Sequence, residues 1–251
     1  MNNLNVRQQN IIELVHQQEY CSIEELAQRF EVTTQTIRRD INELCRLGLT
    51  RRHHGGVGLP ATLSNRSYAS RQVTNQQEKQ LIADEVVKAI PNGTTLFLGI
   101  GTTIALVAER LANHSELRVV TNNFEAAHIL SHFENIETWI PGGRIRTNDR
   151  DVVDGSAEQF YGQFSADIGI IGCAGITEIA QPHSEMINFG RTEEVDTQLF
   201  AMEHELREAK VSQAILANSE QKWLVANKSK WQRRANTKVA PLNYFDRVFS
   251  N

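Results

Sequence analysis

Hydrophobic and polar positions in the first sixty residues recur with the period of short amphipathic helices. A first helix is expected over residues 7–18, because the apolar residues of this segment fall on one stripe among polar ones. They are Ile11, Ile12, Leu14 and Val15.

The next thirty residues predict two more helices joined by a brief connection. Ser22 and Glu25 have the spacing of a capping box, which favours a second helix from this point. Thr34 is expected to cap a third helix, and Gly48 to end it. Two short helices separated by so short a turn predict a helix-turn-helix. The inward apolar positions are Ile23, Leu26, Ala27 and Phe30 in the second helix and Ile37, Ile41 and Leu44 in the third.

The polar face of the third helix carries side chains that suit the major groove of DNA. Arg can bind guanine through two hydrogen bonds, Gln and Asn can bind adenine in the same way, and further Arg residues neutralise phosphate. A solvated polar face is the usual meaning of such a stripe by itself, but the neighbouring segments favour DNA binding. The stripe consists of Gln35, Arg38, Arg39, Asn42 and Arg46, at positions i, i+3, i+4, i+7 and i+11.

Residues 49–58 predict a β-hairpin with a glycine turn and a basic strand, as in the wing of a winged helix-turn-helix. The chain as a whole has a formal charge of −4. Attraction to phosphate depends on where charge is clustered, however, rather than on the total. Residues 38–54 hold five Arg against Asp40 and Glu43, which is a local charge of +3.

The second part of the chain has a different pattern. Residues 59–75 have no sustained apolar period and predict a linker between domains at 1–58 and 76–251, with Arg66 and Arg71 as exposed side chains or phosphate contacts. After Gln76, helices alternate with apolar strands, which predicts an α/β domain with a mostly parallel sheet covered on both faces. A helix is expected through Leu81, Ile82, Val86 and Ile90, and strands at 95–98, 117–121, 136–140, 167–172 and 223–226.

Small and polar residues follow three of these strands, at the end of the sheet where ligands bind in such folds. Gly99-Ile100-Gly101-Thr102-Thr103 leaves the first strand and opens a helix, so backbone N–H groups and two hydroxyls can converge on a phosphate. A glycine turn with a threonine cap is the more common meaning of this short motif alone. The repetition at 121–123 and 141–144 favours a ligand site.

Composition excludes several classes of protein. With 40% hydrophobic and 22% charged residues, and no apolar run near the roughly 18 residues of a membrane span, we expect a cytoplasmic globular protein. The start has no signal-peptide pattern. Cys21, Cys45 and Cys173 lack CxxC spacing, which argues against a disulfide framework or a zinc ribbon, and we expect them to be reduced and buried. No cofactor or metal is expected, since the histidines lack ligand spacing: His114, His128, His132, His183 and His204.

Four segments of the first domain together resemble the DeoR-type helix-turn-helix signature: 25–27, 30–33, 36–42 and 52–56. The run from Arg52 to Gly56 looks most like the branch of glycerol-3-phosphate regulon repressors. The resemblance implies a bacterial repressor of carbon catabolism, with a carboxy-terminal sensor domain similar in fold to ribose-5-phosphate isomerase. Operator contacts are then expected from Ser22, Thr33, Thr34, Gln35, Thr36, Arg38, Arg39, Asn42, Arg46, Arg51, Arg52 and His53.

The same resemblance implies a phosphorylated sugar or polyol as effector, with glycerol 3-phosphate as one candidate. Segments 170–176 and 229–231 look like the family's glycine-rich strand and Ser-Lys-Phe segment, and Glu205 with Glu208 looks like its acidic helix. The chain departs from the family pattern at Gly99, where an Asp is common, and in the longer segment 177–202. The expected effector contacts are Gly101, Thr102, Thr103, Thr121, Asn122, Gly142, Gly143, Glu208 and Lys230.

Two other functions remain open at this point. An isomerase-like sheet with Glu205, Glu208 and Lys230 could supply acid, base and phosphate contact to a sugar-phosphate isomerase. Alternatively, the second domain serves only to join copies of a DNA-binding protein. In the favoured function, a dimer or tetramer binds a repeated operator on double-stranded DNA, and the effector changes the affinity.

Overall fold

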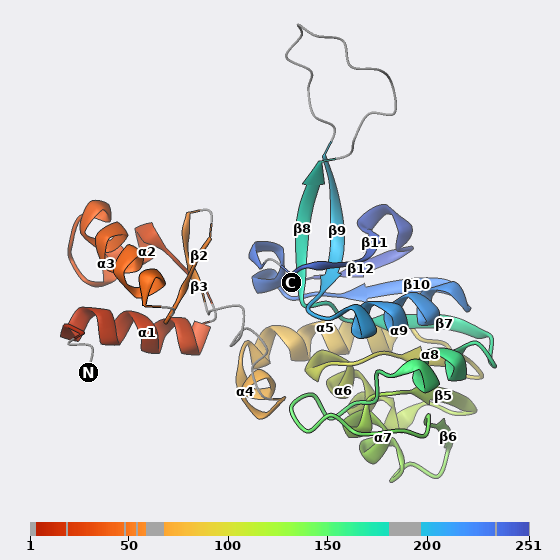
Figure 1. Cartoon of the computed structure of the whole chain (residues 1–251). Coiled ribbons are helices and arrows are strands. Elements are labelled where there is room, and N and C mark those ends of the chain that lie inside the picture. The colour runs from red at the N-terminus through yellow and green to blue at the C-terminus, as the bar shows by residue number, and fades with distance from the viewer. Residues whose placement is uncertain are drawn as a thin grey trace, which may run out of the picture. The chain divides into compact units, whose positions relative to one another are not determined.

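The computed structural model describes residues 4–18, 20–47, 49–53, 55–58, 68–180, 197–233 and 235–250. The chain forms two compact units, Met1–Thr74 and Asn75–Asn251 (Figure 1). Each unit has its own hydrophobic core.

The first unit is a helix-turn-helix with a small antiparallel sheet in the order β1-β3-β2. Ile37, Ile41 and Leu44 pack inward from the third helix, as their spacing predicts, against buried residues of the first two helices. The elements are α1 (Val6–Gln18), β1 (Tyr20–Ser22), α2 (Ile23–Arg29), α3 (Thr34–Arg46), β2 (Arg51–His53), β3 (Gly56–Gly58) and α4 (Tyr68–Val73).

The caps of these helices agree with the sequence at α2 and differ at α3. At α2, the Glu25 amide donates to Ser22 Oγ at 3.1 Å, and the Ser22 amide donates to Glu25 Oε2 at 3.0 Å, which is the expected capping box. At α3, the prediction of Thr34 as cap is wrong. Thr33 is the cap, because it has the extended backbone that a cap needs, whereas Thr34 is already helical. Gly48 lies outside the described residues.

Strand β1 was not expected from the sequence, and it fixes the hairpin to the helices. Ser22 pairs with Gly56 in the sheet and also caps α2, while the Ile23 amide donates to the Gly55 carbonyl at 2.9 Å. A Cβ at Gly56 would lie 2.6 Å from the Tyr20 ring and 2.4 Å from the Cys21 carbonyl oxygen. Only glycine fits at this position of the hairpin.

Part of the segment that the sequence pattern assigned to the linker is helical. Residues 68–73 form α4, and Tyr68 in its first turn is 2% exposed. Arg71 lies with its guanidinium carbon 6.0 Å from the centre of the Tyr68 ring. Six residues are too few to show a helical period, which explains why the pattern did not reveal this helix. Arg66 is outside the described residues.

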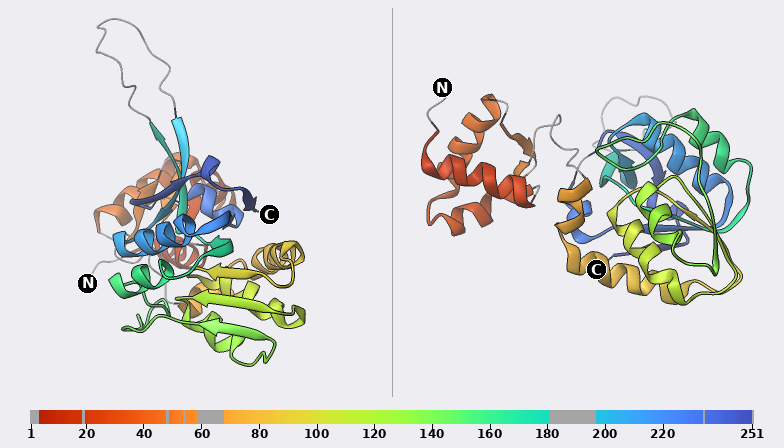
Figure 2. Two further views of the ribbon diagram at one scale, coloured as in Figure 1. Left: turned by 90° about the vertical axis from the view of Figure 1, so that its right-hand side faces the viewer. Right: turned by 90° about the horizontal axis from the view of Figure 1, so that it is seen from below.

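The second unit is a six-stranded parallel sheet, in the order β12-β10-β7-β4-β5-β6, with helices on both faces (Figure 2). A smaller antiparallel sheet has the order β11-β9-β8. The elements are α5 (Gln76–Ala89), β4 (Thr95–Leu98), α6 (Thr102–Glu109), η1 (Arg110–Asn113), β5 (Leu117–Thr121), α7 (Phe124–Leu130), β6 (Ile136–Trp139), α8 (Gly155–Tyr161), β7 (Ala166–Ile171), β8 (Gly175–Ala180), β9 (Thr197–Glu203), α9 (Leu206–Ala217), β10 (Ser219–Val225), η2 (Lys228–Gln232), β11 (Thr237–Pro241), η3 (Leu242–Tyr244) and β12 (Arg247–Phe249).

Alternation along the strands divides the core of this unit into two layers. Leu96 and Leu98 of β4 pack with α5, α6 and α7, whereas Phe97 packs with α8, α9 and the smaller sheet. Successive side chains of a strand point to opposite faces, so a strand covered on both sides is apolar throughout. This explains why β4 and β5 have the bounds that the sequence predicts. The mostly parallel α/β fold is confirmed.

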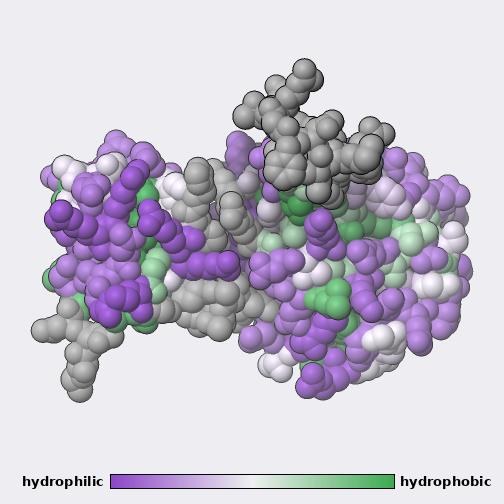
Figure 3. Space-filling model, turned by 45° about the horizontal axis from the view of Figure 1, so that its top comes forward, coloured by the Kyte–Doolittle hydropathy of each residue, from purple (hydrophilic) through white to green (hydrophobic). Residues whose placement is uncertain are grey.

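On the face seen in Figure 3, polar residues predominate and hydrophobic ones form small separate areas. Among the described residues, no helix is both long and apolar enough to cross a membrane. The cysteines are free thiols. Cys21 is buried as expected, but Cys45 in the last turn of α3 and Cys173 between β7 and β8 are only partly buried.

Candidate DNA-binding and effector sites

The polar stripe of α3 is exposed along its whole length. Gln35, Arg38, Arg39, Asn42 and Arg46 are all exposed, and they lie opposite the buried apolar stripe of the same helix. Within the part of the chain that the structure describes, Arg38 and Arg39 pair with no carboxylate. Their guanidinium groups are therefore available to phosphates and base edges.

An acidic residue of α3 is turned away from this stripe. Asp40 is 6% exposed, and Arg7 of α1 donates from Nε to its Oδ2 at 2.6 Å. Gln8 Nε2 donates to the other carboxylate oxygen at 3.3 Å. These bonds join α1 to α3, and Arg7 neutralises the charge of the Asp40 carboxylate.

Two residues of the stripe already have partners within the domain. Arg46 donates to both carboxylate oxygens of Glu43, at 3.0 and 2.6 Å, and this hydrogen bonding lowers the pKa of Glu43. Arg52 of the wing donates from Nη1 to Asn42 Oδ1 at 3.1 Å. An Asn needs both its oxygen and its amide nitrogen to bind adenine bidentately. Asn42 must therefore exchange its bond to Arg52 before it can read that base.

The remaining predicted DNA contacts lie at helix starts and in the wing. Thr33 Oγ1 accepts from the Thr36 amide at 3.3 Å and lies 3.0 Å from the Thr36 hydroxyl, while Thr34 is exposed. The Ser22 hydroxyl accepts from the Glu25 amide and so caps α2. Arg51 and Arg52 of β2 are exposed. His53 belongs to the same strand, but its side chain is outside the described part of the structure.

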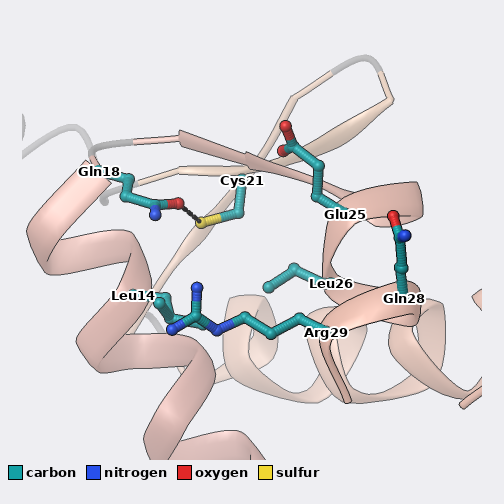
Figure 4. Close-up of a pocket in the computed structure, with 7 residues that line it drawn as sticks. All are labelled: Leu14, Gln18, Cys21, Glu25, Leu26, Gln28 and Arg29. Carbon is teal, nitrogen blue, oxygen red and sulfur yellow. Dashed lines mark hydrogen bonds between the residues drawn. The ribbon is translucent and has the colours of Figure 1, made fainter. Parts of the chain in front are cut away.

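A surface hollow in the first unit lies on other elements than this stripe (Figure 4). Cys21 points into it and donates to Gln18 Oε1 at 3.4 Å. Burial raises the pKa of the Cys21 thiol to about 11, which keeps it protonated at neutral pH. The lining residues come from α1, β1 and α2 and are Leu14, Gln18, Cys21, Glu25, Leu26, Gln28 and Arg29.

In the second unit, the loop after β4 has the features of an anion site. Gly101 precedes α6 with φ of +115°, a conformation that favours glycine, and offers no side chain to cap the amides of the first turn. Lys79 of α5 is 6% exposed and donates from Nζ to Thr102 Oγ1 at 3.0 Å. Backbone amides, a helix start and an ammonium group thus meet at one point.

Lys79 was missed in the sequence, although a signal for it exists. It falls at i, with Ile82, Ala83 and Val86 at i+3, i+4 and i+7, all of which are buried. A lysine on the apolar face of a helix is unusual because burying an ammonium group without partners is unfavourable. This position alone marks Lys79 as a residue with a specific partner.

The end of β5 lies beside this loop, but its polar side chains serve the protein itself. Thr121 is 0% exposed and donates to the Leu98 carbonyl at 2.8 Å. Asn122 is 3% exposed, donates to the Val152 carbonyl and accepts from the Tyr161 hydroxyl. Both of these predicted effector contacts therefore act as supports of the loops. The neighbouring Asn123 donates to the Gly101 carbonyl at 3.1 Å.

The loop after β6 is exposed at Gly142 and Gly143. Ser156 donates from Oγ to the Gly142 carbonyl at 2.8 Å. Gly143 has φ of +146°, and a Cβ there would lie 2.7 Å from Val152 Cγ1. The backbone can adopt this conformation only with glycine.

Glu208 belongs to a buried group of charges, which we call the Arg146 cluster: Arg146, Asp149, Asp151, Glu205 and Glu208. Arg146 donates to both oxygens of Asp151 at 2.7 and 2.8 Å and to Glu208 Oε1 at 2.8 Å. Oxygens of Asp149 and Glu205 lie 3.5 and 3.6 Å from Arg146 Nη1. Burial raises the pKa of Glu208, and the nearby guanidinium opposes this shift without reversing it.

Glu205 and Glu208 also form a capping box at the start of α9. Lys230 is half-buried in η2. Burial raises the pKa of the Cys173 thiol to about 12, and the positive charge of Lys230 partly opposes this shift. Among the described residues, no group of three His, Cys, Asp or Glu could hold a metal ion. His183 lies outside them.

Comparison with known proteins identifies the family of this chain. The model of the DeoR-like helix-turn-helix domain matches residues 7–62, and that of the DeoR C terminal sensor domain matches residues 74–192. The chain is 38% identical to the glycerol-3-phosphate regulon repressors of Escherichia coli and Haemophilus influenzae, over 98% of its length and 90% and 88% of theirs. It is 34% identical to the E. coli repressor CsqR, over 98% of its length and 87% of that protein.

Solved structures are more distant. Ribose-5-phosphate isomerase A from Methanocaldococcus jannaschii is similar over 63% of this chain and 55% of its own, with a TM-score of 0.41 and 17% identity. The sorbitol operon regulator SorC from Klebsiella pneumoniae is similar over 100% of this chain and 97% of its own, with a TM-score of 0.41 and 10% identity. With its DNA-binding and sensor domains both matched and its curated relatives covered almost end to end, the chain belongs to the DeoR family of DNA-binding transcriptional regulators.

Proposed function

We propose that the protein is a repressor of a carbon-catabolism operon, and that a phosphorylated sugar or polyol changes its affinity for the operator. The exposed stripe of α3 carries the DNA-binding part of the proposal, since Arg38 and Arg39 are exposed and form no ion pair with any described residue. Arg51 and Arg52 of the wing supply phosphate contacts beside it. A homodimer or homotetramer places two such helices on a repeated operator.

The start of α6 supports the effector part of the proposal. A phosphate held by the amides of Gly101, Thr102 and Thr103 would lie next to Lys79, which already bonds to Thr102. The names of the similar repressors in E. coli and H. influenzae make glycerol 3-phosphate the first compound to test. Gly142 and Gly143 offer exposed backbone on the third strand-end loop, and Lys230 is a further candidate contact.

The test is a fluorescence-anisotropy titration of the full chain on DNA from its own promoter at fixed salt. Glycerol 3-phosphate, hexose phosphates and pentose phosphates are added in turn, with inorganic phosphate as the control anion. We expect one of the organic phosphates to change the operator affinity at least tenfold. Tight specific binding that no compound alters would refute the effector, and absence of specific binding would refute the regulator.

A pair of lysine variants on α5 tests the effector site itself. Lys79→Gln should weaken the response to the effector while operator affinity without effector stays unchanged. Lys88→Gln removes the same charge from an exposed position in the last turn of the same helix and should leave both quantities unchanged. Equal effects of the two variants would contradict a phosphate contact at Lys79.

We further propose that the chain has no isomerase activity. Glu208, one of the two carboxylates that could serve such an enzyme as acid or base, is 4% exposed, and it accepts hydrogen bonds from Arg146 and from the Glu205 amide at the start of α9. Such a carboxylate cannot approach a substrate without breaking two structural contacts. Turnover of ribose 5-phosphate by the purified protein would contradict this part of the proposal.

A further inference from the structure

The Arg146 cluster connects two parts of the sensor domain that are far apart in the sequence. Arg146 lies in the loop after β6, and Glu208 lies in the first turn of α9, 62 residues later. Arg146 is the one cation among these five residues, and its side chain is 9% exposed. A guanidinium fork is suited to this place because Nε and Nη2 bind Asp151 while Nη1 remains for Glu208.

The contacts continue from the cluster to the loop after β5. Asp151 forms a β-bridge with Asn123, and the amides of Phe124 and Val152 donate to the carbonyls of Arg150 and Asn122 at 2.8 and 3.1 Å. The backbone around Asp151 is thus fixed to the backbone around Asn123.

Asn123 completes the connection to the start of α6. Its Nδ2 donates to the Gly101 carbonyl at 3.1 Å, while its Oδ1 accepts from the Ala126 amide at 3.2 Å to cap α7. The contacts therefore run from α9 through Arg146, Asp151 and Asn123 to Gly101. Every bond along this route joins described residues of one domain.

We propose that Arg146 is a positioning residue for the anion-binding loop at Gly101–Thr103. Among the described residues, its side-chain hydrogen bonds and ion pairs go to Asp149, Asp151, Glu205 and Glu208 and none to that loop. By holding Asp151 against α9, it fixes Asn123 and through it the Gly101 carbonyl, so the amides of the first turn of α6 point to one place before any ligand arrives. The same contacts make α9 the element that responds when the loop changes. The functional consequence rests on the proposed effector site, but the coupling itself does not.

Hydrogen–deuterium exchange of the full chain tests the coupling without a ligand. Arg146→Lys keeps the charge, but its one nitrogen cannot reproduce the planar fork in which Nε and Nη2 bind Asp151 while Nη1 binds Glu208. Asp151→Asn keeps the shape and one acceptor oxygen. In both variants we expect exchange in peptides covering 99–106 and 121–127 to increase at least tenfold, while peptides covering 82–90 and 219–225 remain as in the wild type.

The matched control is Arg118→Lys, which changes an exposed arginine that pairs with Glu137 across β5 and β6. It should alter none of these peptides. Unchanged exchange at 99–106 in Arg146→Lys or Asp151→Asn would overturn the proposal, as would an equal increase throughout the domain, which indicates only lost stability. If Arg146→Lys does not fold, Asp151→Asn decides the question alone.

A second measurement separates this inference from the proposed function. Glycerol 3-phosphate and inorganic phosphate are titrated into wild type and Asp151→Asn by calorimetry, and we expect at least tenfold weaker binding of glycerol 3-phosphate to the variant. If the wild type binds neither compound while the exchange result holds, the proposed effector is refuted and the positioning role of Arg146 stands. Equal affinities of the two proteins together with altered exchange would overturn the role of Arg146 in ligand binding.

Discussion

Replacement of Arg38 by alanine tests the reading of the operator most directly. Arg38 is exposed and has no ion pair among the described residues, so its loss should change the free energy of unfolding by no more than about 0.5 kcal/mol. If Arg38 binds a guanine through two hydrogen bonds, the variant loses about 1–3 kcal/mol of discrimination at that base. This corresponds to an affinity about 5- to 150-fold lower on the natural operator.

The assay is anisotropy on the operator and on a set of single-base variants, at several salt concentrations. Arg38→Ala should weaken binding to the natural operator and bind all bases equally at one position. Arg51→Ala should weaken binding to every sequence alike and reduce the slope of log affinity against log salt by about 1, because it removes the proposed phosphate contact.

Arg29→Ala is the matched control, since it removes the same charge from an exposed position on α2. Its affinity should remain close to that of the wild type. If Arg38→Ala keeps the full base preference of the wild type, Arg38 does not read a base. If Arg29→Ala and Arg38→Ala lose affinity equally, only net charge matters and the assignment of the α3 face is wrong.

Three other substitutions test contacts within the individual domains. Gly56→Ala should abolish operator binding and lower the melting temperature of the first domain, because the new Cβ meets the Tyr20 ring; normal binding would show that the wing can shift. Asp40→Ala should cost about 1–3 kcal/mol of unfolding free energy in denaturant titrations, because it removes the acceptor of the half-buried Arg7 and the buried Gln8. A loss below 0.5 kcal/mol would contradict a structural role for this pair. Because burial raises the folded-state pKa of Glu208, that group favours folding below the usual Glu pKa and loses this contribution as pH rises through the folded value. Glu208→Gln should thus gain stability relative to wild type as pH rises above about 4.3, the usual Glu pKa, in melting experiments; the opposite trend would mean that the ion pair outweighs burial.

The sequence best predicts the helices that local contacts stabilise and the strands that are buried on both faces of the sheet. The residues of α2 and α3 show their caps and periods directly, with an error of one residue at Thr33. Strands β4 and β5 are apolar on both faces and are recognised as such. By contrast, β10 begins at Ser219, four residues before the predicted strand. The sequence pattern does not reveal this start because Glu220 and Gln221 are polar and exposed.

Elements that depend on distant partners were not predictable. Strand β1 has only three residues, and pairing with β3 stabilises it, so no pattern within it distinguishes it from a loop. Strands β8 and β9 alternate between more and less buried positions and lie on either side of a long segment, which hides their pairing.

The candidate effector site shows the same division. The sheet topology predicts that the three strand-end loops meet, and hydrogen bonds do join the loops after β4 and β5. The sequence does not predict which polar groups remain for a ligand. The Asn122 side chain accepts a hydrogen bond from Tyr161, 39 residues away, and the Glu208 carboxylate accepts one from Arg146. Those pairings arise from tertiary packing, which no spacing within a segment encodes.

The bond between Arg52 and Asn42 bears on how regulators of this kind can diverge. A substitution at position 52 would release the Asn42 amide and thereby make adenine readable at a site in the operator, without any change in the recognition helix. With Asn42 as the expected adenine contact, the wing would then set part of the base preference from outside the major groove. Two paralogues with identical α3 sequences can therefore come to recognise different operators through their hairpins alone.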